Sequence, residues 1–80
     1  MFIVKITGTA TETNPSFKGD VQVHYIGKGG YVYDRPDYCP AWSRKHFAEK
    51  WIKQDREWDE RYNREHDQHF WDNEYEIIEI

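Results

Sequence analysis

The sequence predicts one α+β domain over residues 1–80, in which a small, mostly antiparallel sheet of three to four strands packs on one long amphipathic helix, in the order β-β-β-α-β. Three observations lead to this prediction. Apolar and polar residues alternate in short segments near both ends of the chain, as in half-buried strands. Residues 42–71 contain neither Gly nor Pro and repeat aromatic residues at helical spacing. A Gly-rich tip at residues 27–30 separates two strand-like segments, as in a β-hairpin.

The strands are predicted from their alternating pattern, at residues 2–7, 21–26, 31–33 and 75–80. The segment 8–19 contains three Thr, two Gly, Asn14, Pro15 and Ser16 and is expected to form a loop. The side chains expected to form the core are Phe2, Val4, Ile6, Val21, Val23, Phe47, Trp51, Ile52, Ile77 and Ile80.

An aromatic stripe follows one side of the predicted helix. At about 100° per residue, its members fall within one narrow sector: Phe47, Trp51, Trp58, Tyr62 and His69. Asp55 falls in the same sector, so a helix that bends or splits near residues 54–56 is the alternative to a continuous one. Ser43 is expected to be the N-cap.

The predicted helix is longer than the predicted sheet. A helix over residues 42–71 measures about 40–45 Å at 1.5 Å per residue, whereas strands of about six residues span roughly 20 Å. The outer half of the aromatic stripe then lacks a partner within the chain. Contiguous exposed aromatic area usually marks an interface, and two antiparallel copies would bury the same stripe on both subunits. We therefore expect a homodimer, or else a different protein partner on this surface.

Charge divides the chain into two parts. Residues 1–54 contain eight Lys or Arg and five Asp or Glu, a net charge of +3. Residues 55–80 contain three Arg and ten Asp or Glu, a net charge of −7. Such a division gives a small domain an electric field with a direction, which affects the choice of partner rather than the fold.

The expected compartment is the cytoplasm. Cys39 is the only cysteine, so no intrachain disulfide can form, as is usual in a reducing environment. No apolar run approaches the roughly 20 residues that span a bilayer, so we expect no membrane association.

Four segments carry a resemblance to a known class of protein: the hairpin with its Gly-rich tip, and residues 41–45, 47–52 and 75–80. Together they resemble small uncharacterised proteins of phages and prophages, over residues 20–53 and 74–80. The resemblance implies a ββαβ-type fold and a mobile-element origin, and hence the cytoplasm of a bacterial host. That class includes stoichiometric inhibitors of host defence, anti-CRISPR proteins among them. It carries no catalytic residue across to this chain.

The pattern favours non-catalytic protein binding, with no cofactor and no enzymatic activity, because no pair of catalytic groups is assembled in the sequence. Aromatic side chains on the outer helix would become buried in the partner. The acids around them would orient it by attraction to a basic surface, such as that of a nucleic-acid-binding host protein. The residues expected to form this partner-binding surface are Trp58, Tyr62, Phe70, Trp71, Asp55, Asp59, Glu60, Glu65 and Asp67.

The first alternative is a nucleic-acid-binding accessory protein. Aromatic faces beside cations can stack bases and contact phosphates. The residues that would do so here are Lys28, Tyr31, Arg35, Arg44 and Lys45. The acidic C-terminal third and a pI near 5.5 disfavour this reading, because nucleic-acid-binding domains are usually basic.

The second alternative is a metal-binding protein. His66 and His69 are three residues apart and would lie on one helical face, with Asp59 about two turns away from His66. Zinc would need further ligands from elsewhere, such as Cys39 or His24. Two histidines without the Glu of a His-Glu-x-x-His motif are a frequent coincidence, so we expect no metal site.

Overall fold

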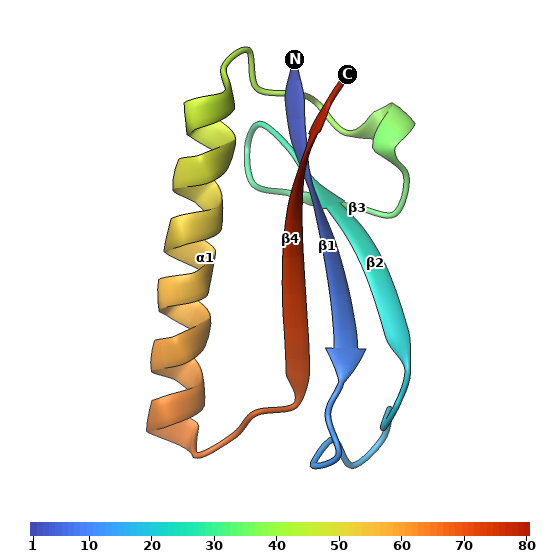
Figure 1. The fold of residues 1–80 in the computed structure, drawn as a ribbon, viewed down its shortest axis with the longest axis vertical. Helices are drawn as coiled ribbons and strands as arrows, with labels where there is room; N and C mark the ends of the chain where they lie inside the picture. Colours follow the sequence, from blue (N-terminus) through green and yellow to red (C-terminus); the bar gives the residue numbers. More distant parts are fainter.

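The computed structural model describes residues 1–80 and confirms the predicted α+β class and the order β-β-β-α-β. Four antiparallel strands form one sheet in the order β3-β2-β1-β4. The elements are β1 (Phe2–Ala10), β2 (Val21–Ile26), β3 (Val32–Tyr33), a short 3₁₀ helix η1 (Pro36–Tyr38), α1 (Lys45–His66) and β4 (Trp71–Glu79). α1 runs alongside β4 without a bend, and both chain ends lie at the end of the sheet where α1 begins (Figure 1).

The helix and the sheet are matched in length. β1 and β4 contain nine residues each, or about 30 Å at 3.3 Å per residue. α1 contains 22 residues, or about 33 Å at 1.5 Å per residue. The expected excess of helix over sheet is therefore wrong. β1 extends into the segment expected to be a loop, and β4 begins at a residue expected to lie in the helix.

α1 is continuous, with no break near residues 54–56, and it ends earlier than expected. Asp67 follows its last residue in a left-handed conformation, with φ 51° and ψ 46°. A short polar side chain tolerates this conformation and lets the chain turn away from the helix. The carbonyl of Asn63 accepts hydrogen bonds from the backbone N–H groups of Asp67 and Gln68, which close the last turn. At the other end Arg44, and not Ser43, occupies the N-cap, with no side-chain hydrogen bond.

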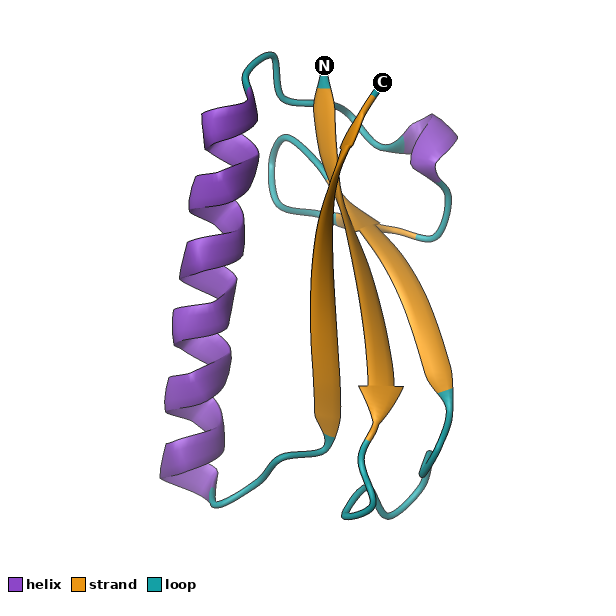
Figure 2. Cartoon of the chain, in the orientation of Figure 1, coloured by secondary structure: helices purple, strands orange, loops and turns teal.

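At the end of the sheet where α1 terminates, the loop after β1 and the loop before β4 are joined by hydrogen bonds. Figure 2 shows both loops at this end. The hydroxyls of Thr11 and Thr13 donate to the backbone carbonyl of His69, at 2.6 and 2.8 Å. The amide nitrogen of Asn14 donates to the carbonyl of Phe70 at 3.1 Å. These side chains fix the start of β4, because they bind the residues that lead into it.

The hydrophobic core lies under the N-terminal half of α1. Val4 pairs with Ile26 on one side and with Ile77 on the other, and Val4, Ile26 and Ala48 are almost completely buried. The small side chain of Ala48 lets the helix approach the sheet closely. The partly buried side chains around these three are Phe2, Ile6, Trp42, Trp51, Ile52, Tyr75 and Ile77.

Val21 and Val23 do not belong to the core, contrary to expectation. The register pairs Val21 with Thr9 and Val23 with Thr7, on the face of the sheet that α1 does not cover. Val21 is 59% exposed and Val23 is 39% exposed. Ile26 faces α1 and is buried there. Because side chains of a strand alternate between the two faces of the sheet, Val21 and Val23 then lie on the opposite face.

The aromatic stripe of α1 is turned away from the sheet. The line that faces the sheet contains Ala48, Ile52, Asp55, Asp59 and Asn63, which are buried or half-buried. Among the predicted stripe only Trp51 packs against the core. Phe47, Trp58 and Tyr62 are 43%, 60% and 42% exposed, and Ile80 at the chain end is exposed as well. The helix is therefore rotated by roughly a quarter turn from the predicted orientation.

α1 is long enough to cross a bilayer, but its many charged residues mean that no helix of this structure qualifies as a membrane span.

Candidate functional site

The C-terminal half of α1 meets the sheet through polar groups. The hydroxyl of Tyr75 in β4 donates a hydrogen bond of 2.5 Å to Oδ2 of Asp55. The guanidinium of Arg56 lies 5.0 Å from the centre of the Tyr75 ring. Burial, the bond to Asp55 and the nearby charge of Asp59 raise the pKa of Tyr75 well above its ordinary value. The phenol thus stays protonated and remains a donor across the physiological range.

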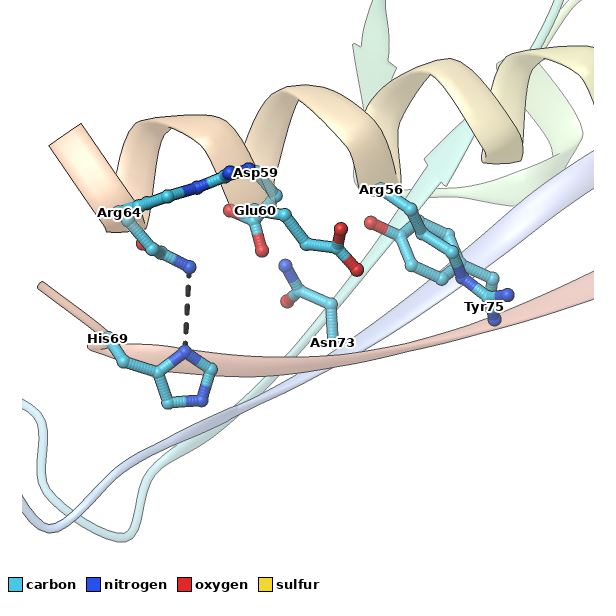
Figure 3. Close-up of a pocket in the computed structure, with 8 residues that line it drawn as sticks. Arg56, Asp59, Glu60, Arg64, His69, Asn73 and Tyr75 are labelled. Atoms are coloured by element: carbon cyan, nitrogen blue, oxygen red, sulfur yellow. Dashed lines mark hydrogen bonds between the residues drawn. The ribbon is translucent and has the colours of Figure 1, made fainter.

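A groove of about 540 Å³ lies between this half of α1 and β4 (Figure 3). It is lined by Arg56, Asp59, Glu60, Asn63, Arg64, His69, Asn73 and Tyr75. The pKa of Asp59 is raised by burial first, then by the charge of Asp55, while His69 acts in the opposite direction. The groove therefore presents cations and carboxylates side by side, and Tyr75 is the one hydrophobic residue that lines it.

A second, smaller hollow of about 260 Å³ opens on the β2 side of α1. Asp59 and Asn73 line both cavities, so the two are separated by little more than these side chains. Gly8 of β1 lies at its floor, where a Cβ atom would stand 2.8 Å from Oδ1 of Asn73. Polar space thus continues beneath the helix, where a larger domain would have apolar packing.

Exposed aromatic rings form a row on the flank of α1, which we call the aromatic flank and define as Trp58 and Tyr62. Arg61 lies over the ring of Trp58 at 5.7 Å. His66 stacks on Tyr62, with ring centres 4.1 Å apart. These neighbours cover the rings only in part, so both remain exposed to solvent on a rigid helix.

The other residues expected in the partner-binding surface are placed elsewhere. Phe70 and Trp71 precede and begin β4, and they are half-buried against the 11–19 loop, where Trp71 packs on Phe17 at 6.0 Å. Asp55 and Asp59 face the sheet, and Glu60 lines the groove. Glu65 and Asp67 are exposed at the end of α1. The structure therefore does not bring all nine residues to a single surface.

The basic and aromatic residues of the nucleic-acid alternative gather at the opposite end of the molecule. The residues Lys28, Tyr31, Arg35, Arg44 and Lys45 are all exposed. Arg35 lies 5.9 Å from the ring centre of Tyr38. Beside them is a groove of about 450 Å³ lined by Met1, Lys28, Ala41, Trp42, Ser43 and Phe47. This end is positive and carries exposed rings, whereas the end where α1 terminates is acidic.

The histidines of the metal alternative are not brought together. Asp67 ends α1 between them, so the expected stacking on one helical face is wrong. Nδ1 of His66 lies 3.0 Å from the carbonyl oxygen of Tyr62, whereas Nε2 of His69 lies 2.5 Å from Oδ1 of Asp72. Asp59 and His69 line one groove without His66. No group of three or more His, Cys, Asp or Glu side chains is arranged to hold a metal ion.

Cys39 entered the sequence analysis only as a possible further zinc ligand, and the outer edge of β4 was not identified there as a site. Cys39 is buried against Gly27, and burial raises the pKa of its thiol, which disfavours a reactive thiolate. β4 was predicted as a strand, but its place at the edge depends on the order of strands in the sheet, which the alternating pattern does not give.

Comparison with protein-family models, curated protein sequences and solved structures finds no match for this chain.

Proposed function

We propose that this protein is a non-catalytic binding module that docks on a partner protein through the aromatic flank of α1. The observation that supports this most directly is the 60% exposure of Trp58 in the middle of a regular helix. A tryptophan held on a rigid element loses little conformational freedom on binding and contributes a large apolar area. Tyr62 follows one turn later, so two rings can enter one groove of a partner.

The proposed partner has a basic surface. Residues 55–80 carry a net charge of −7, and this part of the chain includes the aromatic flank and β4. Attraction between this region and a basic protein would speed association and fix its orientation. A host protein built to hold nucleic acid has such a surface, and occupying it would make this chain a stoichiometric inhibitor in the cytoplasm of a bacterial host.

The partner can be sought by affinity capture from a bacterial lysate, with matched variants of the bait. Trp58→Ala/Tyr62→Ala removes the flank, while Tyr31→Ala/Tyr38→Ala removes two exposed rings at the opposite end. We expect the parent and the second variant to retain the same protein and the first variant to lose it. Equal capture by both variants would contradict the proposal.

A homodimer is a different way to cover the flank, since a second copy also offers aromatic rings, although the acidic residues of the two copies would repel each other. Light scattering at increasing protein concentration measures the mass directly. We expect a dimer that Trp58→Ala converts to a monomer. A monomer at all concentrations would leave a different protein as the partner of the flank.

Nucleic-acid binding is a second candidate, because exposed Lys28, Arg44 and Lys45 lie at the same end as exposed Tyr31 and Tyr38. Fluorescence anisotropy with a labelled single-stranded oligonucleotide tests it. If this end binds the strand, Arg44→Ala/Lys45→Ala should weaken binding and reduce its dependence on salt. Binding that this variant leaves unchanged would contradict the candidate.

A further inference from the structure

The outer edge of β4 has no hydrogen-bonding partner. The sheet order places β4 at an edge. The N–H of Ile80 donates to the carbonyl of Met1 at 2.8 Å, and the N–H of Thr11 donates to the carbonyl of Phe70 at 2.9 Å. These two bonds show which residues of β4 direct their backbone groups toward β1. Even-numbered residues of β4 therefore bond to β1, and the backbone groups of the odd-numbered ones point outward. No hydrogen bond from the rest of the chain reaches these outward groups.

Space for an additional strand lies along this edge. The groove of about 540 Å³ is formed by α1 on one side and by Asn73 and Tyr75 of β4 on the other. Asn73 and Tyr75 are two of the residues whose backbone groups point outward. Figure 3 shows α1 above this part of β4, with Arg56, Glu60 and Arg64 on the helix. An extended segment added here would have α1 above its helix-facing side chains.

The acidic side chains of β4 favour a basic segment at this edge. Asp72, Glu74 and Glu76 alternate along β4 on the face that α1 does not cover, because they pair with Thr9, Thr7 and Lys5. All three carboxylates are exposed, and neither Glu74 nor Glu76 forms an ion pair. Every second side chain of an added strand would lie beside this row. Opposite charges on neighbouring strands stabilise pairing.

A second copy of β4 fits poorly at the same edge. Antiparallel two-fold pairing about residue 75 sets Glu74 opposite Glu76 of the other copy. Pairing about residue 74 or residue 76 sets the same carboxylate opposite itself. Like charges directly opposite each other destabilise a strand pair. We propose that the outer edge of β4 binds an extended basic segment of another protein by strand addition, with Lys or Arg at alternate positions.

This inference extends the proposed protein-binding function to a second surface, and its test uses the aromatic flank only as a control. The probe is an octapeptide of alternating Lys and Thr, and calorimetry measures its affinity. Two further peptides carry N-methyl groups either on every Thr amide or on every Lys amide. Each methylation removes the donors of one edge of the peptide and keeps its charge.

We expect the unmethylated peptide to bind one to one, and one methylated peptide to bind at least about tenfold more weakly, as the loss of several backbone hydrogen bonds requires. Loss on Thr methylation indicates antiparallel addition, and loss on Lys methylation indicates parallel addition. Equal binding of both methylated peptides would overturn the proposal, because charge alone would then hold the peptide. No binding of the unmethylated peptide would overturn it as well.

Two variants of the protein complete the test. Asn73→Pro removes one outward N–H at an edge position that tolerates proline, and Asn73→Ala removes the same side chain but keeps the N–H. Only the first should weaken peptide binding, while Trp58→Ala should leave it unchanged. Equal affinity of the two Asn73 variants would contradict strand addition. A protein dimer that Asn73→Pro abolishes would assign the edge to a second copy instead and would also overturn the proposal.

Discussion

Tyr75 and Asp55 form the one direct hydrogen bond between the side chains of β4 and α1, at 2.5 Å. The phenol belongs to the rim of the hydrophobic core, and the carboxylate is the first polar residue of the helix line that faces the sheet. The bond therefore marks the place where the helix–sheet interface changes from apolar to polar. Arg56 over the Tyr75 ring adds a cation to the same junction.

Tyr75→Phe should destabilise the protein by about 1.5–3 kcal/mol, because it removes a hydrogen bond to a charged group and leaves a half-buried carboxylate without its donor. Urea denaturation followed by tryptophan fluorescence measures the change. Tyr31→Phe is the matched control, since Tyr31 is 70% exposed and forms no hydrogen bond. Equal stability of the two variants would show that the Tyr75–Asp55 bond contributes nothing to stability.

Asp59→Asn should stabilise the protein at neutral pH. Burial and the neighbouring Asp55 raise the pKa of Asp59 above its ordinary value of 3.8, so the folded protein holds this proton more tightly than the unfolded chain does. Stability from this group is present below that ordinary value and is lost as pH rises through the raised pKa.

Because Asp59 is only half-buried and solvent screens its charge, the gain at pH 7 should be only on the order of a few tenths of a kcal/mol. Denaturation curves at several pH values between 4 and 7 measure it, with the exposed Glu65→Gln as the control. A variant less stable than the parent at pH 7 would mean that the Asp59 carboxylate is favourable to the fold.

Trp51→Ala should destabilise the protein strongly, whereas Trp58→Ala should hardly change its stability. Trp51 packs against the core and lies edge-on to Tyr75, with ring centres 6.4 Å apart, so its loss should cost about 2–4 kcal/mol. Trp58 is mostly exposed, so its loss should change stability by no more than about 0.5 kcal/mol. Thermal melting of both variants checks this. Similar melting temperatures would contradict the rotation of α1 described above.

Gly27→Ala should be severely destabilising. A Cβ atom at this position would stand 1.8 Å from the carbonyl oxygen of Pro40 and 2.7 Å from Sγ of Cys39. Relief requires a backbone shift between the end of β2 and the segment before α1, at a cost of at least about 3 kcal/mol. Gly8→Ala is the control, because its closest contact is the exposed side chain of Asn73, which can move. Denaturant midpoints should differ clearly between the two.

Alternation and helical spacing were sufficient to predict the class and order of elements. They failed where tertiary contacts decide. The phase of β2 depends on Ile26, whose burial turns Val21 and Val23 outward, although the alternation itself was read correctly. The start of β4 depends on the left-handed Asp67 and on hydrogen bonds from the 11–19 loop. The residues of β2 alone do not reveal its phase, and the residues of β4 alone do not reveal where it starts.

The rotation of α1 could not be predicted from its own sequence. Summed hydrophobicity favours the sector with Trp58 and Tyr62, whereas the structure turns Ala48 to the sheet because only a small side chain permits close packing on Val4 and Ile26. Asp55 inside the apolar sector was the one local signal of a different arrangement. A bend near residues 54–56 was the alternative that it suggested, but the helix is continuous and Asp55 is the acceptor for the Tyr75 hydroxyl.

The division of the interface into an apolar and a polar half also bears on motion. The N-terminal half of α1 is held by the buried cluster around Ala48, whereas beyond Asp55 the helix lies over polar, hollow space. Segments with few buried apolar contacts open at a lower free energy than the molecule as a whole. The last two turns of α1 should therefore lift from the sheet as a small cooperative unit, pivoting near Asp55. In hydrogen exchange, amides after residue 59 would then exchange long before those of residues 49–55, and widening of the groove beside β4 would accompany each opening.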